Sequence, residues 1–218
     1  IYLFSTTYFC KKIIMIVVAA SDEQWNELTG GRAGIKWQRV ENSAAFSQYK
    51  HAAAFFSLHN NEILPEFESL KKPVFINSVV QTLGALTAPE NIYRINGWAT
   101  FLNRSVWEIA GTVNEEVDAV FKSLHIKINF VKDEPGFIAA RVIAMIINEA
   151  YFALEDNVSS KTEIDTAMKL GTNYPFGPFE WVGLIGNKNV LALLQQLYAT
   201  DSRYKPSELL IKEATENN

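Results

Sequence analysis

Polar side chains that could do chemistry follow two of the strands expected from the sequence. His59 comes directly after the apolar segment 52–58, and Asn77 and Ser78 follow a second such segment. The carboxyl ends of parallel strands meet at one edge of a sheet, where open α/β sheets bind ligands. Histidine exchanges a proton near neutral pH, and amide or hydroxyl groups can orient a ligand. These three residues are therefore candidate binding residues, with a surface turn beside Asn60-Asn61 as the alternative for His59.

Glu108 is a fourth candidate, in the expected strand 106–110. A carboxylate in a site can act as a general base, and the alternative is an exposed strand carboxylate without a role. The three histidines and the single cysteine are widely spaced along the chain. Their spacing matches no metal-ligand pattern, so we expect no metal site.

Strand-forming and helix-forming segments alternate along the first part of the chain. Residues 15–20, MIVVAA, form a short continuous apolar run of the kind found in buried parallel strands. We expect further strands at 35–40, 52–58, 73–76 and 126–131, additional ones at 93–101 and 106–110, and helices at 21–28, 43–49, 65–70 and 114–124. This alternation predicts an α/β fold with a short, Rossmann-like parallel sheet.

The remainder of the chain is expected to be helical. Asp133-Glu134-Pro135-Gly136 suits a helix start, and residues 137–154 are apolar except for Arg141, Asn148 and Glu149. Such a helix is buried on most sides, by its own domain or by a second subunit. Two charges and an amide inside the run argue against a membrane span.

Two further patterns mark helix starts in this region. Ser160-Lys-Thr-Glu163 is a capping-box sequence, followed by a short helix that ends at Gly171. Tyr174 to Glu180, YPFGPFE, interrupts the chain and starts another helix. Segments 187–198 and 206–214 complete the helical part.

These motifs, in this order, resemble one family. They are D-x-PGFI-x-x-R from Asp133, NEA at 148–150, the phrase from Glu163 to Gly171, and YP-x-GPFE from Tyr174. They are similar to the C-terminal domain of 3-hydroxyacyl-CoA dehydrogenases over about 133–214. The resemblance implies a Rossmann-like domain at 15–132, a helical dimerisation domain at 133–218, and a homodimer. It also implies NAD as cofactor and NAD-linked oxidation of a 3-hydroxyacyl-CoA, an acyl-CoA-type small molecule.

Carried over residue by residue, the resemblance leaves an incomplete catalytic set. The family's asparagine and glutamate correspond to Asn77 and Glu108. Its serine, catalytic histidine and asparagine are replaced by Val79, Thr100 and Ala140. A threonine cannot take up a proton near neutral pH, and residues of one catalytic set act as a unit. The alternative is therefore a non-catalytic relative: a ligand-binding, regulatory or dimerisation protein.

The turn after the first strand also departs from dinucleotide-binding folds. Such folds carry G-x-G-x-x-G there, because glycines let the pyrophosphate approach the backbone. Residues 19–23 contain no glycine and end in Asp22 and Glu23. The glycines at 30–34 follow the expected helix and are better explained as a turn. We therefore expect this turn to oppose pyrophosphate binding.

Composition narrows the remaining possibilities. A net charge of −4 without a Lys/Arg stripe argues against nucleic-acid binding, and no segment indicates a membrane partner. The single cysteine excludes an internal disulfide and fits a reducing, cytoplasmic location. Met15 is the first methionine, so we expect the preceding 14 residues to be an upstream extension. The alternative is an additional strand or short helix that packs on the domain.

Overall fold

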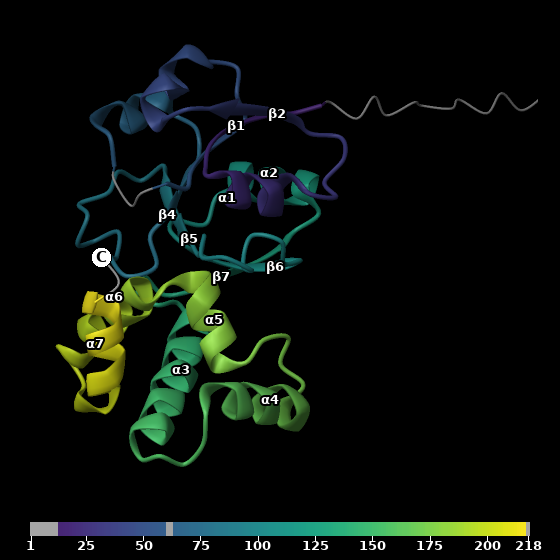
Figure 1. Ribbon diagram of the computed structural model, residues 1–218. Helices are drawn as coiled ribbons and strands as arrows, with labels where there is room; N and C mark the ends of the chain where they lie inside the picture. Colours follow the sequence, from purple (N-terminus) through teal and green to yellow (C-terminus); the bar gives the residue numbers. More distant parts are fainter. Residues whose placement is uncertain (1–12, 60–62, 217–218) are drawn as a thin grey trace, which may run out of the picture.

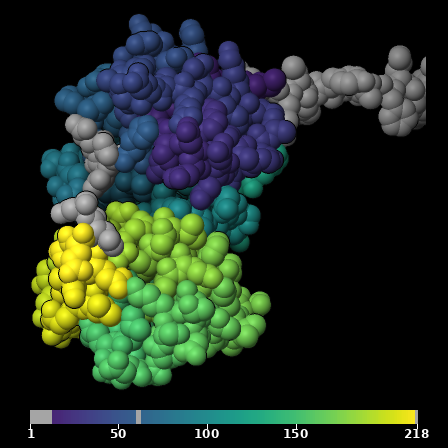
Figure 2. All heavy atoms as spheres, in the orientation of Figure 1, coloured from purple at the N-terminus to yellow at the C-terminus, as the bar shows by residue number. Residues whose placement is uncertain are grey.

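The structure, a computed structural model, describes residues 13–59 and 63–216. A sheet-containing part lies above a helical part, and Figure 1 shows α5 and α6 between the sheet and the rest of the helices. The space-filling view shows the same two parts in direct contact (Figure 2). The segment predicted to be an upstream extension lies outside the described residues up to position 12.

In the described residues, seven strands form one sheet. They are β1 (Met15–Ala19), β2 (Lys36–Val40), β3 (Ala54–Ser57), β4 (Val74–Asn77), β5 (Ile92–Ile95), β6 (Val106–Ala110) and β7 (Lys127–Phe130). Their order is β2-β1-β3-β4-β5-β6-β7. Neighbours run parallel except β5 and β6, which are antiparallel. The predicted parallel sheet is thus confirmed for most strands. It is wrong for β6 and β7, which run parallel to each other but opposite to the other five strands, because the short β5–β6 connection contains no crossover helix.

One predicted strand is too long. The segment 93–101 was expected to be extended, but β5 ends at Ile95. Asn96 Oδ1 accepts the Trp98 N–H at 3.1 Å, and a Cβ on Gly97 would lie 2.7 Å from the Asn77 Cγ. A local side-chain hydrogen bond and a close approach that only glycine permits therefore turn the chain away from the sheet.

The sheet is covered on both faces. Helices α1 (Asp22–Thr29) and α2 (Glu115–Leu124) pack on one face, against a cluster that includes Phe56, Phe75 and Phe121. Two 3-10 segments, η1 (Ser43–Gln48) and η2 (Pro65–Leu70), pack on the other face through Phe46 and Phe67. Burial on both faces explains why the central strands β1, β3 and β4 are nearly continuous apolar runs.

The predicted helices of the second part are confirmed. They are α3 (Ala139–Glu155), α4 (Lys161–Thr172), α5 (Pro178–Ile185), α6 (Asn187–Tyr198) and α7 (Glu208–Glu216), with a 3-10 turn, η3 (Ser202–Tyr204). Ser160 and Glu163 form the expected capping box. In the described part of the chain, none of these helices combines the length and apolarity that a bilayer span requires.

Asp165 gives a physical reason for two of the sequence motifs. It lies on α4, is 8% exposed, and accepts the N–H groups of Phe179 and Glu180 at 2.8 and 3.2 Å. Those groups open α5, so a carboxylate from one helix satisfies the free donors of the next. A Cβ on Gly177 would lie 2.3 Å from the Asp165 Oδ1, which explains the glycine before Pro178.

A partly buried polar network ties α7 to α3 and α4. Glu213 accepts hydrogen bonds from the Tyr151 hydroxyl at 2.7 Å and the Lys161 Nζ at 2.6 Å. Burial alone would raise the pKa of Glu213, but these bonds outweigh it and hold the pKa below the usual 4.5. A carboxylate with a lowered pKa in the folded protein stabilises the fold above its unfolded pKa. That stabilisation is lost as pH falls through the folded pKa.

We therefore expect Glu213→Gln to destabilise the protein at pH 7 and to weaken the acid dependence of stability. The loss relative to wild type should shrink as pH falls below 4.5 and through the lower pKa of Glu213 in the folded protein, because the carboxyl group then becomes protonated in both the unfolded and the folded state. Urea denaturation at several pH values measures this. Glu216→Gln is the matched control, because the Glu216 side chain is 63% exposed. An equal pH slope in the Glu213 variant and wild type would contradict this role.

Candidate functional site

A cleft lies at the carboxyl ends of the parallel strands, where the sheet meets α5 and α6. Its volume is about 690 Å³. The residues that line it come from the start of α1, the ends of β3, β4 and β5, and the two helices; they are Ser21, Glu23, Gln24, Glu27, His59, Asn77, Val79, Val80, Gln81, Gly97, Trp98, Ala99, Leu184, Ile185, Asn189 and Ala192. We call it the strand-end cleft. Its lining combines the carboxylates of α1 and the imidazole and amide groups at the strand ends with largely apolar side chains from α5 and α6.

Two of the predicted binding residues lie in this cleft. His59 lines it, as expected for a residue that follows β3. Asn77 also lines it and joins neighbouring strand ends: its Nδ2 donates to the Leu58 carbonyl at 3.3 Å, and its Oδ1 accepts the Gly97 N–H at 2.9 Å. Both ends of the Asn77 amide are therefore occupied by the backbone. Asn77 shapes the cleft wall and presents little free hydrogen-bonding capacity to a ligand.

Ser78 does not face the cleft. It is 1% exposed, and its hydroxyl donates to the Gln81 carbonyl at 2.8 Å within the loop that follows β4. The sequence placed Ser78 correctly at the sheet edge. Side chains alternate in direction along an extended chain, however, so adjacent residues such as Asn77 and Ser78 cannot both point the same way.

Glu108 lies away from the cleft and anchors a helix. Its Oε2 accepts the N–H groups of Ile138 and Ala139 at 3.2 and 3.1 Å. These are free donors at the start of α3, where the helix dipole also favours a negative charge. The sequence suggested that Glu108 is either a general base or an exposed carboxylate without a role. Its contact with the start of α3 matches neither interpretation. The α3 start lacks a capping side chain of its own, and that was the signal in the sequence.

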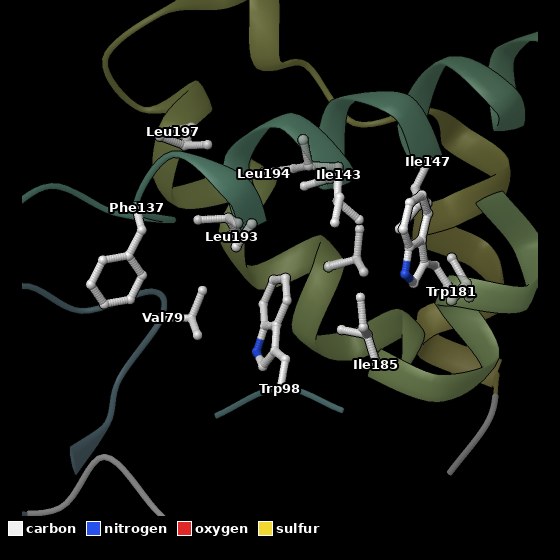
Figure 3. Close-up of a cluster of buried hydrophobic side chains, with 14 of the residues drawn as sticks. Val79, Trp98, Phe137, Ile143, Ile147, Trp181, Ile185, Leu193, Leu194 and Leu197 are labelled. Carbon is white, nitrogen blue, oxygen red and sulfur yellow. The ribbon is translucent and has the colours of Figure 1, made fainter. Parts of the chain in front are cut away.

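The three positions that replace family polar residues have different surroundings. Val79 and Ala140 are 4% and 0% exposed and belong to the apolar cluster of the helical part. Trp98 belongs to the same cluster, and in Figure 3 it lies between Val79 and Ile185. Thr100 adopts a left-handed backbone with φ 75°, and its N–H donates to Glu27 Oε1 at 2.7 Å. Val79 and Ala140 thus contribute to a packed apolar cluster next to the cleft, whereas Thr100 lies outside that cluster.

The residues at the start of α1 indicate whether a dinucleotide pyrophosphate could bind there. The Ser21 hydroxyl accepts the Gln24 N–H, and the Gln24 side chain accepts the Ser21 N–H, each at 3.2 Å. Asp22 and Glu23 follow, and Asp22 forms a 2.7 Å ion pair with Arg39. Two donors are therefore occupied and two carboxylates lie where phosphate charge would fall. The residues at this turn do not fit a pyrophosphate.

A second feature of dinucleotide sites, the acid that binds the ribose, has a counterpart in position only. Glu41 follows β2 directly, where dinucleotide-binding folds carry an acid for the ribose hydroxyls. It lines a neighbouring hollow of about 600 Å³ together with Ser43, Ser57 and His59. Sequence reasoning missed Glu41, although its distance of about 20 residues from the first turn was a usable signal.

A buried arginine, also missed, fixes the cleft wall. Arg94 on β5 is 0% exposed and donates to the Ser78 and Val79 carbonyls at 2.8 and 3.2 Å. Its guanidinium also pairs with Asp133, in the connection to the helices, and lies 4.7 Å from the Phe137 ring centroid. The loop that borders the cleft and the connection to α3 are thereby held by one side chain.

Among the residues described, no group of three or more potential metal ligands occurs.

Comparisons with known proteins agree with these motifs. Residues 136–218 match the family model described as 3-hydroxyacyl-CoA dehydrogenase, C-terminal domain. A 3-hydroxyadipyl-CoA dehydrogenase of Escherichia coli (strain K12) is 45% identical over 86 residues, 38% of this chain and 18% of the relative. A 3-hydroxybutyryl-CoA dehydrogenase of Clostridioides difficile is 40% identical over 116 residues, 50% of this chain and 41% of the relative. The chain thus spans less than half the length of either curated relative.

A solved structure extends the likeness in fold to the sheet. The (S)-3-hydroxybutyryl-CoA dehydrogenase of Ralstonia eutropha superposes with a TM-score of 0.68 at 22% identity, covering 83% of this chain and 70% of that one. At this identity the match establishes fold alone. The sheet is thus similar in fold, and the helical part is similar in both sequence and fold. The chain resembles the 3-hydroxyacyl-CoA dehydrogenase family, most closely in that family's C-terminal domain.

Proposed function

We propose that this chain is a 3-hydroxyacyl-CoA dehydrogenase-type protein whose strand-end cleft binds an acyl-CoA-type thioester. The observation that carries the proposal is the cleft itself. It lies where α/β sheets bind ligands, and α5 and α6 of the matched region close it. Val80, Leu184 and Ile185 give it an apolar wall suited to an acyl chain. The relatives named above act on CoA thioesters, as their names state.

NAD-linked oxidation of a 3-hydroxyacyl-CoA is the activity that the resemblance implies. The α1 start does not fit the cofactor's pyrophosphate, and Thr100 provides no base. These residues favour a second candidate, in which the protein binds the thioester without the usual turnover. Glu108 supports that candidate, because it holds the α3 start and makes no hydrogen bond to a histidine in the described part of the chain.

Binding of acetoacetyl-CoA to the purified full chain tests the proposal, with calorimetric titration as the measurement. Ala192→Trp places a large ring in the cleft from an exposed position on α6 and should weaken binding by about tenfold or more. Gln196→Trp, also exposed on α6 but outside the cleft, is the matched control and should bind like wild type. Absence of binding, or equal binding by both variants, would contradict a thioester site in the cleft.

We also propose that residues 15–132 and 133–218 are two domains, and that the chain forms a homodimer through the α3 region. Ile138 and Val142 support the dimer, because they are 61% and 51% exposed on one side of α3. A second copy of the chain would cover them. Sedimentation of a purely monomeric protein at micromolar concentration would exclude this dimer.

A location in the reducing cytoplasm fits the single cysteine, and cell fractionation would test it.

A further inference from the structure

A small cavity beside β6 contains charged groups that do not pair with one another. It has a volume of about 150 Å³ and lies between β6, the preceding loop, β7 and the start of α3. Its lining consists of Asn96, Phe101, Arg104, Val106, Trp107, Glu108, Asn129 and Ala139. None of these residues lines the strand-end cleft. We call it the β6 pocket.

Arg104 supplies a fixed positive charge to the β6 pocket. Its Nε donates to the Thr100 carbonyl at 3.1 Å, and its Cζ lies 3.8 Å from the Phe101 ring centroid. Within the described parts of the chain, its terminal nitrogens donate no hydrogen bond, and no ion pair joins it to Glu108 within 4.0 Å. Burial lowers the pKa of Arg104, opposed by the charges of Glu108 and Glu27. An arginine nevertheless remains charged in proteins, so two planar donors stay available.

Asn96 has a buried donor group for which the described residues provide no acceptor. It is 8% exposed, and its Oδ1 accepts the Trp98 N–H, which fixes the orientation of the amide. Its Nδ2 is buried and has no hydrogen-bond partner among residues 13–59 and 63–216. Buried amide donors are normally paired, so an unpaired one in the wall of a polar pocket indicates a ligand oxygen.

Glu108 presents the complementary acceptor. Its Oε2 is occupied by the N–H groups of Ile138 and Ala139, as described above. In the described residues, its other oxygen accepts no hydrogen bond. The α3 dipole offsets part of the carboxylate charge, so an anionic group can share the pocket with it. The pocket therefore offers donors from Arg104 and Asn96 and one free acceptor from Glu108.

We propose that the β6 pocket binds a short carboxylic acid that also carries a hydroxyl or ammonium donor. Arg104 and the Asn96 Nδ2 hold the carboxylate, and the free Glu108 oxygen accepts the donor. The charged groups of Arg104 and Glu108 lie further apart than the two groups of an ion pair. A ligand with a carboxylate and a donor bridges that distance. The pocket is too small for a coenzyme, so this site goes beyond the thioester site of the strand-end cleft and does not depend on it.

The test uses three probes that share a three-carbon carboxylate: 3-hydroxypropionate and β-alanine, which carry a terminal donor, and propionate, which carries none. Titration of the full chain, followed by NMR or calorimetry, should give a dissociation constant on the order of 1 mM for a probe that carries a donor. Propionate, which lacks the donor, should bind at least about fivefold more weakly. The better of the two donor probes identifies whether a hydroxyl or an ammonium is preferred. Equal binding of propionate would overturn the role of Glu108.

Two variants test the assigned contacts. Arg104→Gln removes the charge and should weaken binding by about tenfold or more. Asn96→Asp keeps the oxygen that accepts the Trp98 N–H but replaces the donor by a negative charge, and should abolish binding. Lys212→Gln, which removes a 65% exposed charge elsewhere, should leave binding unchanged. Thermal unfolding of each variant confirms folding. Failure of wild type to bind, or unchanged binding by a folded Arg104→Gln protein, would overturn the proposal, whatever the outcome for acetoacetyl-CoA.

Discussion

Replacing Arg94 by methionine should lower the free energy of unfolding by about 3–5 kcal/mol. Methionine retains much of the side-chain volume but removes every hydrogen bond that the guanidinium makes. The Ser78 carbonyl then loses the donor that Arg94 supplies, and the Val79 carbonyl keeps only the Gly136 N–H at 2.7 Å among the described residues. Asp133 loses its ion-pair partner, although 31% of its side chain is exposed and it keeps the Gly84 N–H at 3.2 Å. Breaking a buried pair on one side is costly because the remaining polar groups stay desolvated.

Chemical denaturation of wild type and variant measures this effect. Arg203→Met is the matched control, because the Arg203 side chain is 66% exposed in its ion pair with Asp201. Its loss should stay below about 1 kcal/mol. A loss of similar size in both variants would show that the Arg94 contacts do not hold the two parts of the protein together.

Replacing Trp98 by alanine should cost about 3–5 kcal/mol of stability. Trp98 is 7% exposed, lines the strand-end cleft and packs in the cluster shown in Figure 3. Truncation removes its apolar contacts and leaves a cavity beside Val79 and Ile185. The substitution also joins the cleft to that cavity, so a ligand bound in the cleft would lose a wall.

Trp25→Ala provides the comparison for the Trp98 variant. Trp25 is half-buried on α1, with its ring 6.3 Å from that of Trp37. We expect this variant to lose less than half as much stability, because less apolar area leaves water. Denaturation of both variants under identical conditions decides the point. A loss below about 1 kcal/mol for Trp98→Ala would mean that the ring does not belong to the core.

Much of the fold could be predicted because local patterns match the structure. The apolar run at 15–20 forms β1, and Ser160 with Glu163 caps α4. These features depend on neighbouring residues and on burial, which periodicity and capping patterns report. The strand expected at 93–101 failed because an amide at Asn96 turns the chain, an effect that strand propensity does not contain.

The candidate site was predictable only in part. The positions of His59 and Asn77 followed from the rule that ligands bind at strand ends. The role of Glu108 did not, because its partners lie 30 and 31 positions along the chain, at the start of another element. Arg94 gave no signal either, since a single arginine within a strand sequence does not indicate which carbonyls surround it. Long-range partners of single polar residues appear only once the fold brings them together.

The most direct test of the proposed function is titration of the purified full chain with NADH, with and without acetoacetyl-CoA. We expect acetoacetyl-CoA to bind in the strand-end cleft. We expect no saturable NADH binding up to ~1 mM, because the Asp22 and Glu23 carboxylates lie at the α1 start. No NADH oxidation should follow when both are present. Saturable micromolar NADH binding with oxidation on addition of acetoacetyl-CoA would contradict this account and establish a dehydrogenase with a glycine-free cofactor site.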